Sequence, residues 1–124
     1  MLWNKQVKPE KSVGQQWEQF AADYLTAQGL ALIAQNFHSR NGELDLVMKE
    51  QDCFVFVEVK YRKNNAFGGA ISAVTLTKQQ KISKTAAFFL QQQGLNAYNT
   101  PCRFDVVAID GDNPPEITWL KNAF

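Results

Sequence analysis

Residues 42–62 are the segment that most constrains the fold of this chain. Two apolar runs, 42–48 and 53–62, flank a short polar break at residues 49–52, and this pattern predicts a β-hairpin. Charged residues nevertheless stand inside both runs, namely Glu43, Asp45, Glu58 and Lys60. Because an unpaired buried charge costs free energy, we expect these side chains to pair with one another or to bind a cation.

The two-residue period of a strand brings the four charged residues to one face of the hairpin. The same alternation places Leu44, Leu46 and Met48 together on the opposite face. With a turn at residues 50–53, directly opposed side chains have Cβ atoms roughly 4.5–5.5 Å apart. This register predicts three cross-strand pairs: Lys49 with Phe54, Asp45 with Glu58, and Glu43 with Lys60.

Two opposed carboxylates repel each other, so Asp45 and Glu58 favour a cation between them. Oxygen ligands suit Mg²⁺, Mn²⁺ or Ca²⁺ rather than zinc, and the Lys60 ammonium would lie beside that ion. The alternative is a hairpin held by salt bridges, in which Lys60 simply neutralises Glu43. Residue spacing alone leaves both interpretations open.

Length and composition favour one ordinary globular domain. The chain has 124 residues, of which 45% are hydrophobic, enough to bury a core. It has no apolar run of about 18 residues, and its first residues lack a signal-peptide pattern, so we expect no membrane span. Two cysteines, Cys53 and Cys102, are predicted to be small buried thiols. A cytoplasmic location is therefore expected.

Charge is unevenly distributed along the chain. Residues 59–104 contain no Asp or Glu, whereas the remainder has six basic and twelve acidic residues. Such a block is either an ordinary solvated face or a surface that contacts a phosphate backbone. The residues predicted for that contact are Arg62, Lys63, Lys78, Lys81, Lys84 and Arg103.

The remaining segments predict the element order α-β-β-β-α-β-β, a mixed sheet with helices packed on it. Residues 1–11 are expected to be a loose arm and 12–124 a single domain. Helices are predicted at 12–28, with Ser12 as N-cap and Gln15 completing a capping box, and at 78–93, with Thr77 as N-cap. Further strands are expected at 30–37, 103–110 and 116–120, His38 in an exposed turn, and a loop at 63–77 that is either a substrate-ordered flap or a tolerated insertion.

Asp45 followed by the tripeptide Glu58-Val59-Lys60 resembles the core of the restriction-endonuclease-like superfamily, the PD-(D/E)xK fold. More closely, the chain resembles the YraN-like family of small bacterial proteins, itself similar to archaeal Holliday-junction resolvases. The matching stretches are Gly14-x-x-x-Glu18, Asn36-Phe37, Gly42-Glu43-Leu44-Asp45-Leu46, Phe56-Val57-Glu58-Val59-Lys60-x-Arg62, Phe67-Gly68, Lys78 with Ala86, and Arg103-Phe104-Asp105-Val106-Val107.

The resemblance implies an α/β, restriction-endonuclease-like fold and a role for each matching residue. Glu18, Asp45, Glu58 and the carbonyl of Val59 would hold Mg²⁺ or Mn²⁺, and Lys60 would position or activate the attacking water. Leu44 stands where the superfamily has proline, and Glu43 is a family feature without an assigned role.

The activity implied is hydrolysis of DNA phosphodiester bonds, with RNA as an alternative substrate. Preference for branched structures rather than a base sequence is expected, because no motif for base-edge readout is present. Resolvase relatives act as dimers, which suggests a homodimer. The alternatives are a non-catalytic nucleic-acid-binding or accessory protein on the same fold, and a partner-binding domain.

Overall fold

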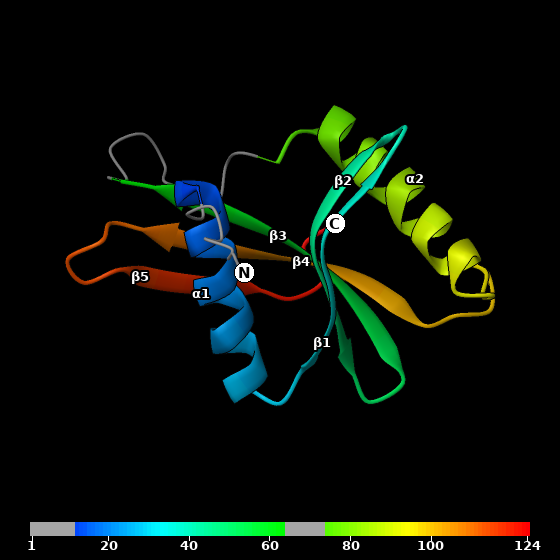
Figure 1. Ribbon diagram of the computed structural model, residues 1–124, viewed down its shortest axis with the longest axis horizontal. Helices are drawn as coiled ribbons and strands as arrows, with labels where there is room; N and C mark the ends of the chain where they lie inside the picture. Colours follow the sequence, from blue (N-terminus) through cyan, green and yellow to red (C-terminus); the bar gives the residue numbers. More distant parts are fainter. Residues whose placement is uncertain (1–11, 64–73) are drawn as a thin grey trace, which may run out of the picture.

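A five-stranded mixed sheet with two helices forms the protein (Figure 1). The computed structural model describes residues 12–63 and 74–124. The strands lie side by side in sequence order, and the predicted element order α-β-β-β-α-β-β is confirmed. The elements are α1 (Val13–Ala27), β1 (Ala31–Ser39), β2 (Gly42–Glu50), β3 (Cys53–Arg62), α2 (Leu76–Gln92), β4 (Cys102–Asp110) and β5 (Glu116–Leu120).

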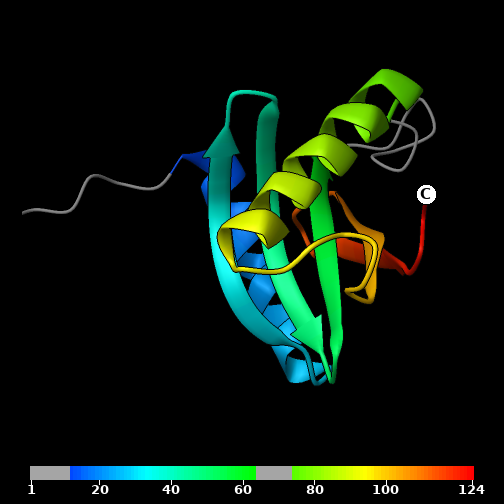
Figure 2. The same ribbon diagram turned by 90° about the vertical axis from the view of Figure 1, so that its right-hand side faces the viewer.

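The two helices cover opposite faces of the sheet. Figure 2 shows α2 in front of the strands and α1 behind them. Ala21, Ala22 and Leu25 of α1 pack in one core cluster with strand residues such as Val55. Residues of α2, including Ile82 and Phe89, pack in a second cluster on the other face. Each helix therefore supplies one half of the hydrophobic core, and the central strands lie between the halves.

Helix α1 begins as its sequence predicts. The Ser12 hydroxyl accepts a hydrogen bond from the Gln15 amide at 3.2 Å, and the Gln15 side chain accepts one from the Ser12 amide at 3.1 Å. This capping box satisfies amide groups that have no partner within the helix. Two apolar residues of the helix stay outside the core, because Val13 is 63% exposed and Phe20 is 37% exposed.

The β2–β3 hairpin has the predicted register over its inner half. Lys49 pairs with Phe54, and the pairing extends to Leu46 opposite Val57. Beyond this point β2 stays paired with β1 as far as Gly42, and Figure 1 shows the outer ends of β1 and β2 turning away from β3. We call the point where β2 leaves β3 the fork.

Strand curvature at the fork changes one predicted orientation. Leu44 packs in the cluster beneath α2, whereas Leu46 and Met48 pack in the cluster beneath α1. The prediction that all three share one face is therefore wrong. The strict two-residue alternation assumes an evenly pleated strand, and β2 bends away from its neighbour between Leu44 and Leu46.

Helix α2 begins two residues earlier than predicted. Its N-cap is Thr75, whose hydroxyl accepts a hydrogen bond from the Lys78 amide at 3.2 Å. The prediction of Thr77 as N-cap is wrong. The Thr75-Leu76-Thr77 sequence offers two threonines of the right type, and only the first has the extended backbone of a cap, with φ −75° and ψ 163°.

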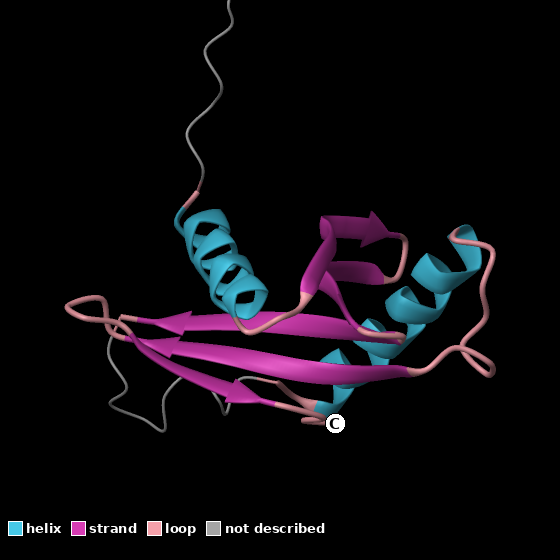
Figure 3. Cartoon of the chain, turned by 90° about the horizontal axis from the view of Figure 1, so that it is seen from below, coloured by secondary structure: helices cyan, strands magenta, loops and turns pink. Residues whose placement is uncertain are grey.

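The second half of the sheet is built by the crossover through α2. Strand β3 pairs with β4 in parallel, and β4 pairs with β5 in antiparallel orientation; Figure 3 shows these strands as one long layer. The predicted arm at 1–11 and most of the predicted loop at 63–77 lie outside the described residues. Cys53 and Cys102 are both free and half-buried. Neither helix is long and apolar enough to span a bilayer within the part that the structure describes.

Candidate active site

A cavity of about 300 Å³ opens at the fork between β2 and β3. Four separate elements line it, and they bring together residues that lie up to 64 positions apart in the sequence, from Glu18 to Ile82. All of the predicted metal and catalytic residues are among them: Glu18 from α1, Asp45 from β2, and Glu58, Val59 and Lys60 from β3. Lys78 and Lys81 of α2 also line this cavity, which we call the acid–lysine cavity.

Where the backbone hydrogen-bond ladder between β2 and β3 ends, the side chains of Asp45 and Glu58 accept hydrogen bonds from backbone amides instead. The Val59 amide donates a hydrogen bond to Asp45 Oδ2 at 2.9 Å, and the Asp45 amide donates to Glu58 Oε2 at 3.5 Å. These side chains are only 8% and 3% exposed. The carboxylates therefore satisfy backbone donors that the diverging strands leave unpaired, and they are held at fixed positions on the cavity wall.

Burial disfavours the ionised form of both carboxylates, and a neighbouring acid adds to the effect in each case. Burial raises the pKa of Glu58 to about 8, with a further contribution from the charge of Asp45, and Lys60 and Lys78 oppose the shift. Burial also raises the pKa of Asp45, although the hydrogen bond from Val59 and the same two lysines lower it. Two acids that resist ionisation in one cavity are characteristic of functional sites and of cation sites.

Glu18 reaches the same cavity from α1. Burial and the nearby charge of Asp45 raise its pKa to about 7, and a hydrogen bond with Asn36 lowers it. One of its carboxyl oxygens, Oε1, is buried and has no hydrogen-bond partner among the described residues. A buried acceptor without a donor is costly, so this oxygen favours a ligand that the protein itself does not supply.

Asn36 is a site residue for which the sequence pattern predicted no role. It lies in β1 with a positive φ of 52°, a conformation that asparagine tolerates better than most residues. Its side chain faces the Glu18 carboxyl. Strand β1 contains a second amide residue, Gln35, directly before Asn36, so the sequence carried no signal that singled out Asn36, and its partner on α1 becomes visible only in the fold.

Lys60 and Lys78 meet in the acid–lysine cavity. Lys60 is half-buried, and burial lowers its pKa, as do the hydrogen bond and positive charge of Lys78. Glu58 and Asp45 oppose that shift. The prediction that Lys60 accompanies the two acids is therefore supported by their shared position, whereas its companion on α2 was expected only on an outer surface.

Glu43 behaves differently from the other acids. It lines the rim of the cavity, but its carboxylate forms an exposed ion pair with His38, with 3.1 Å between Oε2 and Nδ1. His38 lies within strand β1, one residue before its end, and is exposed as expected, although it is not in a turn. The alternative in which Lys60 neutralises Glu43 is thus not the arrangement observed.

The family of the chain is decided by comparison with known proteins. The model of the uncharacterised protein family UPF0102 matches residues 17–109, a segment that contains Glu18, Asp45 and Lys60. The chain belongs to the UPF0102 family. This confirms the YraN-like membership predicted from its motifs.

Relatives within UPF0102 resemble the chain over nearly its full length. A protein of Colwellia psychrerythraea is 54% identical and covers 100% of both chains. One of Vibrio campbellii is 47% identical over 92% of this chain and 93% of its own. One of Shewanella denitrificans is 50% identical over 91% and 99%. Each bears the name UPF0102 protein, which states no activity, so the chemistry must be argued from the cavity.

Several of the predicted nucleic-acid contacts lie outside the cavity of this UPF0102 protein. Arg62 and Lys63 are exposed at the end of β3. Lys84, predicted for the same phosphate-backbone contact as Lys78 and Lys81, instead lines a separate hollow with Leu76, Gln79 and Phe124. The structure therefore divides the three predicted lysines of α2 into two that line the acid–lysine cavity and one that lies outside it.

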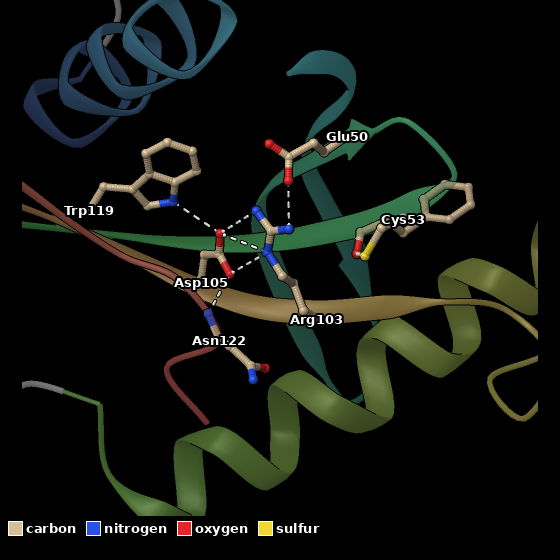
Figure 4. A network of polar contacts seen from close by, with 7 residues as sticks. Glu50, Cys53, Arg103, Asp105, Trp119 and Asn122 are labelled. Atoms are coloured by element: carbon tan, nitrogen blue, oxygen red, sulfur yellow. Dashed lines mark hydrogen bonds and ion pairs between the residues drawn. The ribbon is translucent and has the colours of Figure 1, made fainter. Parts of the chain in front are cut away.

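Arg103 lies in a second polar cluster, shown in Figure 4, and neither Arg103 nor its partners Glu50 and Asp105 line the acid–lysine cavity. Its guanidinium contacts Glu50 at 2.7 Å and Asp105 at 3.1 Å. Asp105 is completely buried and also accepts hydrogen bonds from Trp119 Nε1 at 2.9 Å and the Asn122 amide at 2.8 Å. Burial alone would lower the pKa of Arg103, but the bonds to Asp105 and Glu50 raise it.

The acids of the cavity supply the donor atoms that a divalent cation prefers, but their side chains do not converge on one point. Among residues 12–63 and 74–124, no three acid, histidine or cysteine side chains converge closely enough to hold a metal as they stand. The donor set is nevertheless all oxygen, which suits Mg²⁺ or Mn²⁺. Such an ion would give the unpartnered oxygen of Glu18 a ligand and would lower the raised pKa of Glu58.

Proposed function

We propose that this UPF0102 protein is a divalent-metal-dependent endonuclease that hydrolyses phosphodiester bonds of DNA. The observation that carries the proposal is the acid–lysine cavity, in which Glu18, Asp45, Glu58 and Lys60 line one space although they come from three elements. A salt-bridged hairpin would need neither the acid from α1 nor three carboxylates with raised pKa values.

Glu18, Asp45 and Glu58, with the carbonyl oxygen of Val59, would hold Mg²⁺ or Mn²⁺. When bound, such an ion lowers the pKa of water and polarises the phosphoryl oxygen. The protein contributes rigidity, because the bonds between Asp45 and the Val59 amide and between Glu58 and the Asp45 amide fix two of these acids on the sheet. Glu18 closes the site from the opposite helix.

Lys60 is placed to act on the reacting groups. It is two residues from Glu58 on the same strand and lines the same cavity. Its ammonium can donate to the attacking water or to a non-bridging phosphate oxygen, and the charge that develops on that oxygen would be stabilised. The lowered pKa of Lys60 follows from its burial and from Lys78 beside it.

The substrate class follows from the charge around the cavity. Lys78 and Lys81 line it, and Arg62, Lys63 and Lys84 are exposed on neighbouring surfaces. Contacts of this kind recognise a phosphate backbone without reading base sequence. We therefore propose selection by DNA structure, with branched DNA as the first substrate to test, RNA as a comparison, and a homodimer as the working form.

Cleavage assays test this proposal directly. Branched, single-stranded and duplex DNA would be incubated with Mg²⁺ or Mn²⁺ and wild-type protein, Asp45→Asn or Lys60→Ala. We expect the wild type to cut and both variants to lose activity by about a hundredfold or more. Asp52→Asn, which removes an exposed carboxylate from the β2–β3 turn, is the matched control and should cut normally.

Equal activity in all four proteins would show that a contaminating nuclease cuts, and the proposal would fail. Salt-sensitive DNA binding without cleavage under any condition would favour the alternative, a non-catalytic nucleic-acid-binding protein on this fold. Metal binding has its own readout, since Mn²⁺ affinity measured by electron paramagnetic resonance should fall in Glu18→Gln and remain unchanged in Asp52→Asn.

A further inference from the structure

Two positive side chains share the acid–lysine cavity although like charges repel. Lys60 comes from β3 and Lys78 from the first turn of α2; both line the cavity, and Lys78 lies close enough to act on the Lys60 ammonium. Lys60 is half-buried, so water does not fully screen this repulsion. Stability alone does not explain why the Lys78 side chain lies beside that of Lys60.

Lys78 differs from the other lysines of α2 in what its charge reaches. Its charge acts on Asp45, Glu58 and Lys60. Lys81 lines the cavity one turn further along, and Lys84 lines a different hollow. Lys78 is therefore the lysine of α2 that belongs to the centre of the site.

The charge of the cavity defines the ligand that would suit this arrangement. Its walls carry one more carboxylate than ammonium group, counting Glu43 at the rim. A divalent cation would leave one positive charge in excess, which a phosphodiester monoanion would neutralise. With the cation held by the acids, the ammonium groups of Lys60, Lys78 and Lys81 are the remaining donors for the phosphate oxygens, and Lys60 and Lys78 are the two that lie together.

We propose that Lys78 is a second phosphate-binding residue, which grips the substrate phosphate together with Lys60. This inference rests on the proposed function for its substrate, but the pairing of the two lysines is independent of whether cleavage follows. Lys78 would therefore contact the reacting phosphate, whereas the sequence predicted that it contacts the nucleic-acid backbone outside the site. Lys84 remains an outer residue.

Binding of inorganic phosphate tests the inference without any cleavage. Phosphate affinity in the presence of Mg²⁺ would be measured by ³¹P nuclear magnetic resonance for wild type, Lys78→Ala and Lys84→Ala. We expect Lys78→Ala to bind about five- to tenfold more weakly, the loss of one charge-assisted hydrogen bond at a partly exposed site. Lys84→Ala removes the same side chain from the same helix and should bind like the wild type.

Equal affinity in Lys78→Ala and Lys84→Ala would overturn the inference, as would a wild type that binds no phosphate. Lys78 is exposed, so both variants should fold, and matching thermal unfolding curves would check this. Phosphate binding that depends on Lys78 in a protein that cuts no nucleic acid would uphold the inference while contradicting the proposed endonuclease.

Cleavage kinetics distinguish a residue at the reacting phosphate from an outer contact. Lys78→Ala should lower kcat by about tenfold or more, because the lost interaction strengthens as charge develops on the phosphate. Lys84→Ala should raise KM and leave kcat unchanged. The reverse pattern would place Lys78 on the outer surface and contradict the inference.

Discussion

The acid–lysine cavity and the Arg103–Asp105 cluster both contain buried carboxylates on the same sheet, but these carboxylates differ in their hydrogen-bond partners and neighbouring charges. Asp105 is fully buried and accepts hydrogen bonds from Arg103, Trp119 and Asn122. Glu58 is 3% exposed but has a neighbouring acid and a raised pKa of about 8. Glu18 leaves one oxygen without a partner among the described residues.

This contrast distinguishes a structural use of buried charge from a functional one. The Arg103–Asp105 cluster is complete, since a guanidinium, an indole and a backbone amide fill the acceptor positions of Asp105. It ties β2, β4 and the chain after β5 together. The acid–lysine cavity holds its acids without enough donors, and such under-satisfied groups are typical of sites that await a ligand.

The largest effect on stability is expected from Asp105→Ala. The change would leave the Arg103 guanidinium, the Trp119 indole and the Asn122 amide without their acceptor, and we expect the free energy of unfolding to fall by about 3–5 kcal/mol. Glu58→Gln also removes a buried acid but should be neutral or stabilising at pH 8, because it removes a charge that burial and the repulsion from Asp45 both disfavour. Urea denaturation would measure both, and equal losses would break the comparison.

A change of pH is expected to have a smaller effect on the free energy of unfolding. In the unfolded chain Glu58 titrates near its ordinary value of 4.5, whereas in the folded protein its pKa is about 8. The folded state therefore binds more protons between these values, and the free energy of unfolding should fall as the pH rises from about 5 to about 8 in EDTA. Glu18, with a pKa of about 7, acts in the same direction.

Glu58→Gln should flatten this part of the stability curve, which chemical denaturation at a series of pH values would reveal. An unchanged slope in the variant would show that other groups cause the dependence. Mg²⁺ should also reduce the slope in the wild type, because a cation bound to the acids stabilises their ionised forms.

The smallest effect is expected from Glu43→Gln. The contact of Glu43 with His38 is more than half exposed on both sides, and exposed pairs contribute about 0–1 kcal/mol. Stability in urea should change within that range, and cleavage should be retained. A large loss of activity with normal stability would instead move Glu43 from the rim into the reacting centre.

The sequence alone predicted the architecture well because local signals agreed with one another. The capping box of Ser12 and Gln15, the Lys49–Phe54 register and the apolar runs all arise from neighbours in sequence. The position of the fork was not predictable in this way. It depends on β2 following β1 rather than β3, and the misplaced face of Leu44 is its result.

Basic residues show the limit of sequence reasoning more clearly. Lys78, Lys84 and Arg103 look alike within an acid-free segment, yet one enters the acid–lysine cavity, one stays outside, and one is enclosed between Glu50 and Asp105. Glu50 is 53 residues from Arg103 in the sequence. Charge composition identifies the basic segment of the sequence. Which of its residues lie on the surface, in the site or in the core depends on how α2 and β4 pack.

The Val59 amide has a further use that follows from its unusual acceptor. Most amides of the sheet donate to backbone carbonyls, but this one donates to Asp45 Oδ2. The strength of that bond depends on whether the carboxylate is ionised and what else it binds. Its proton chemical shift and hydrogen-exchange rate therefore form a built-in spectroscopic probe of the site, readable in the intact protein without substrate or label on the acids.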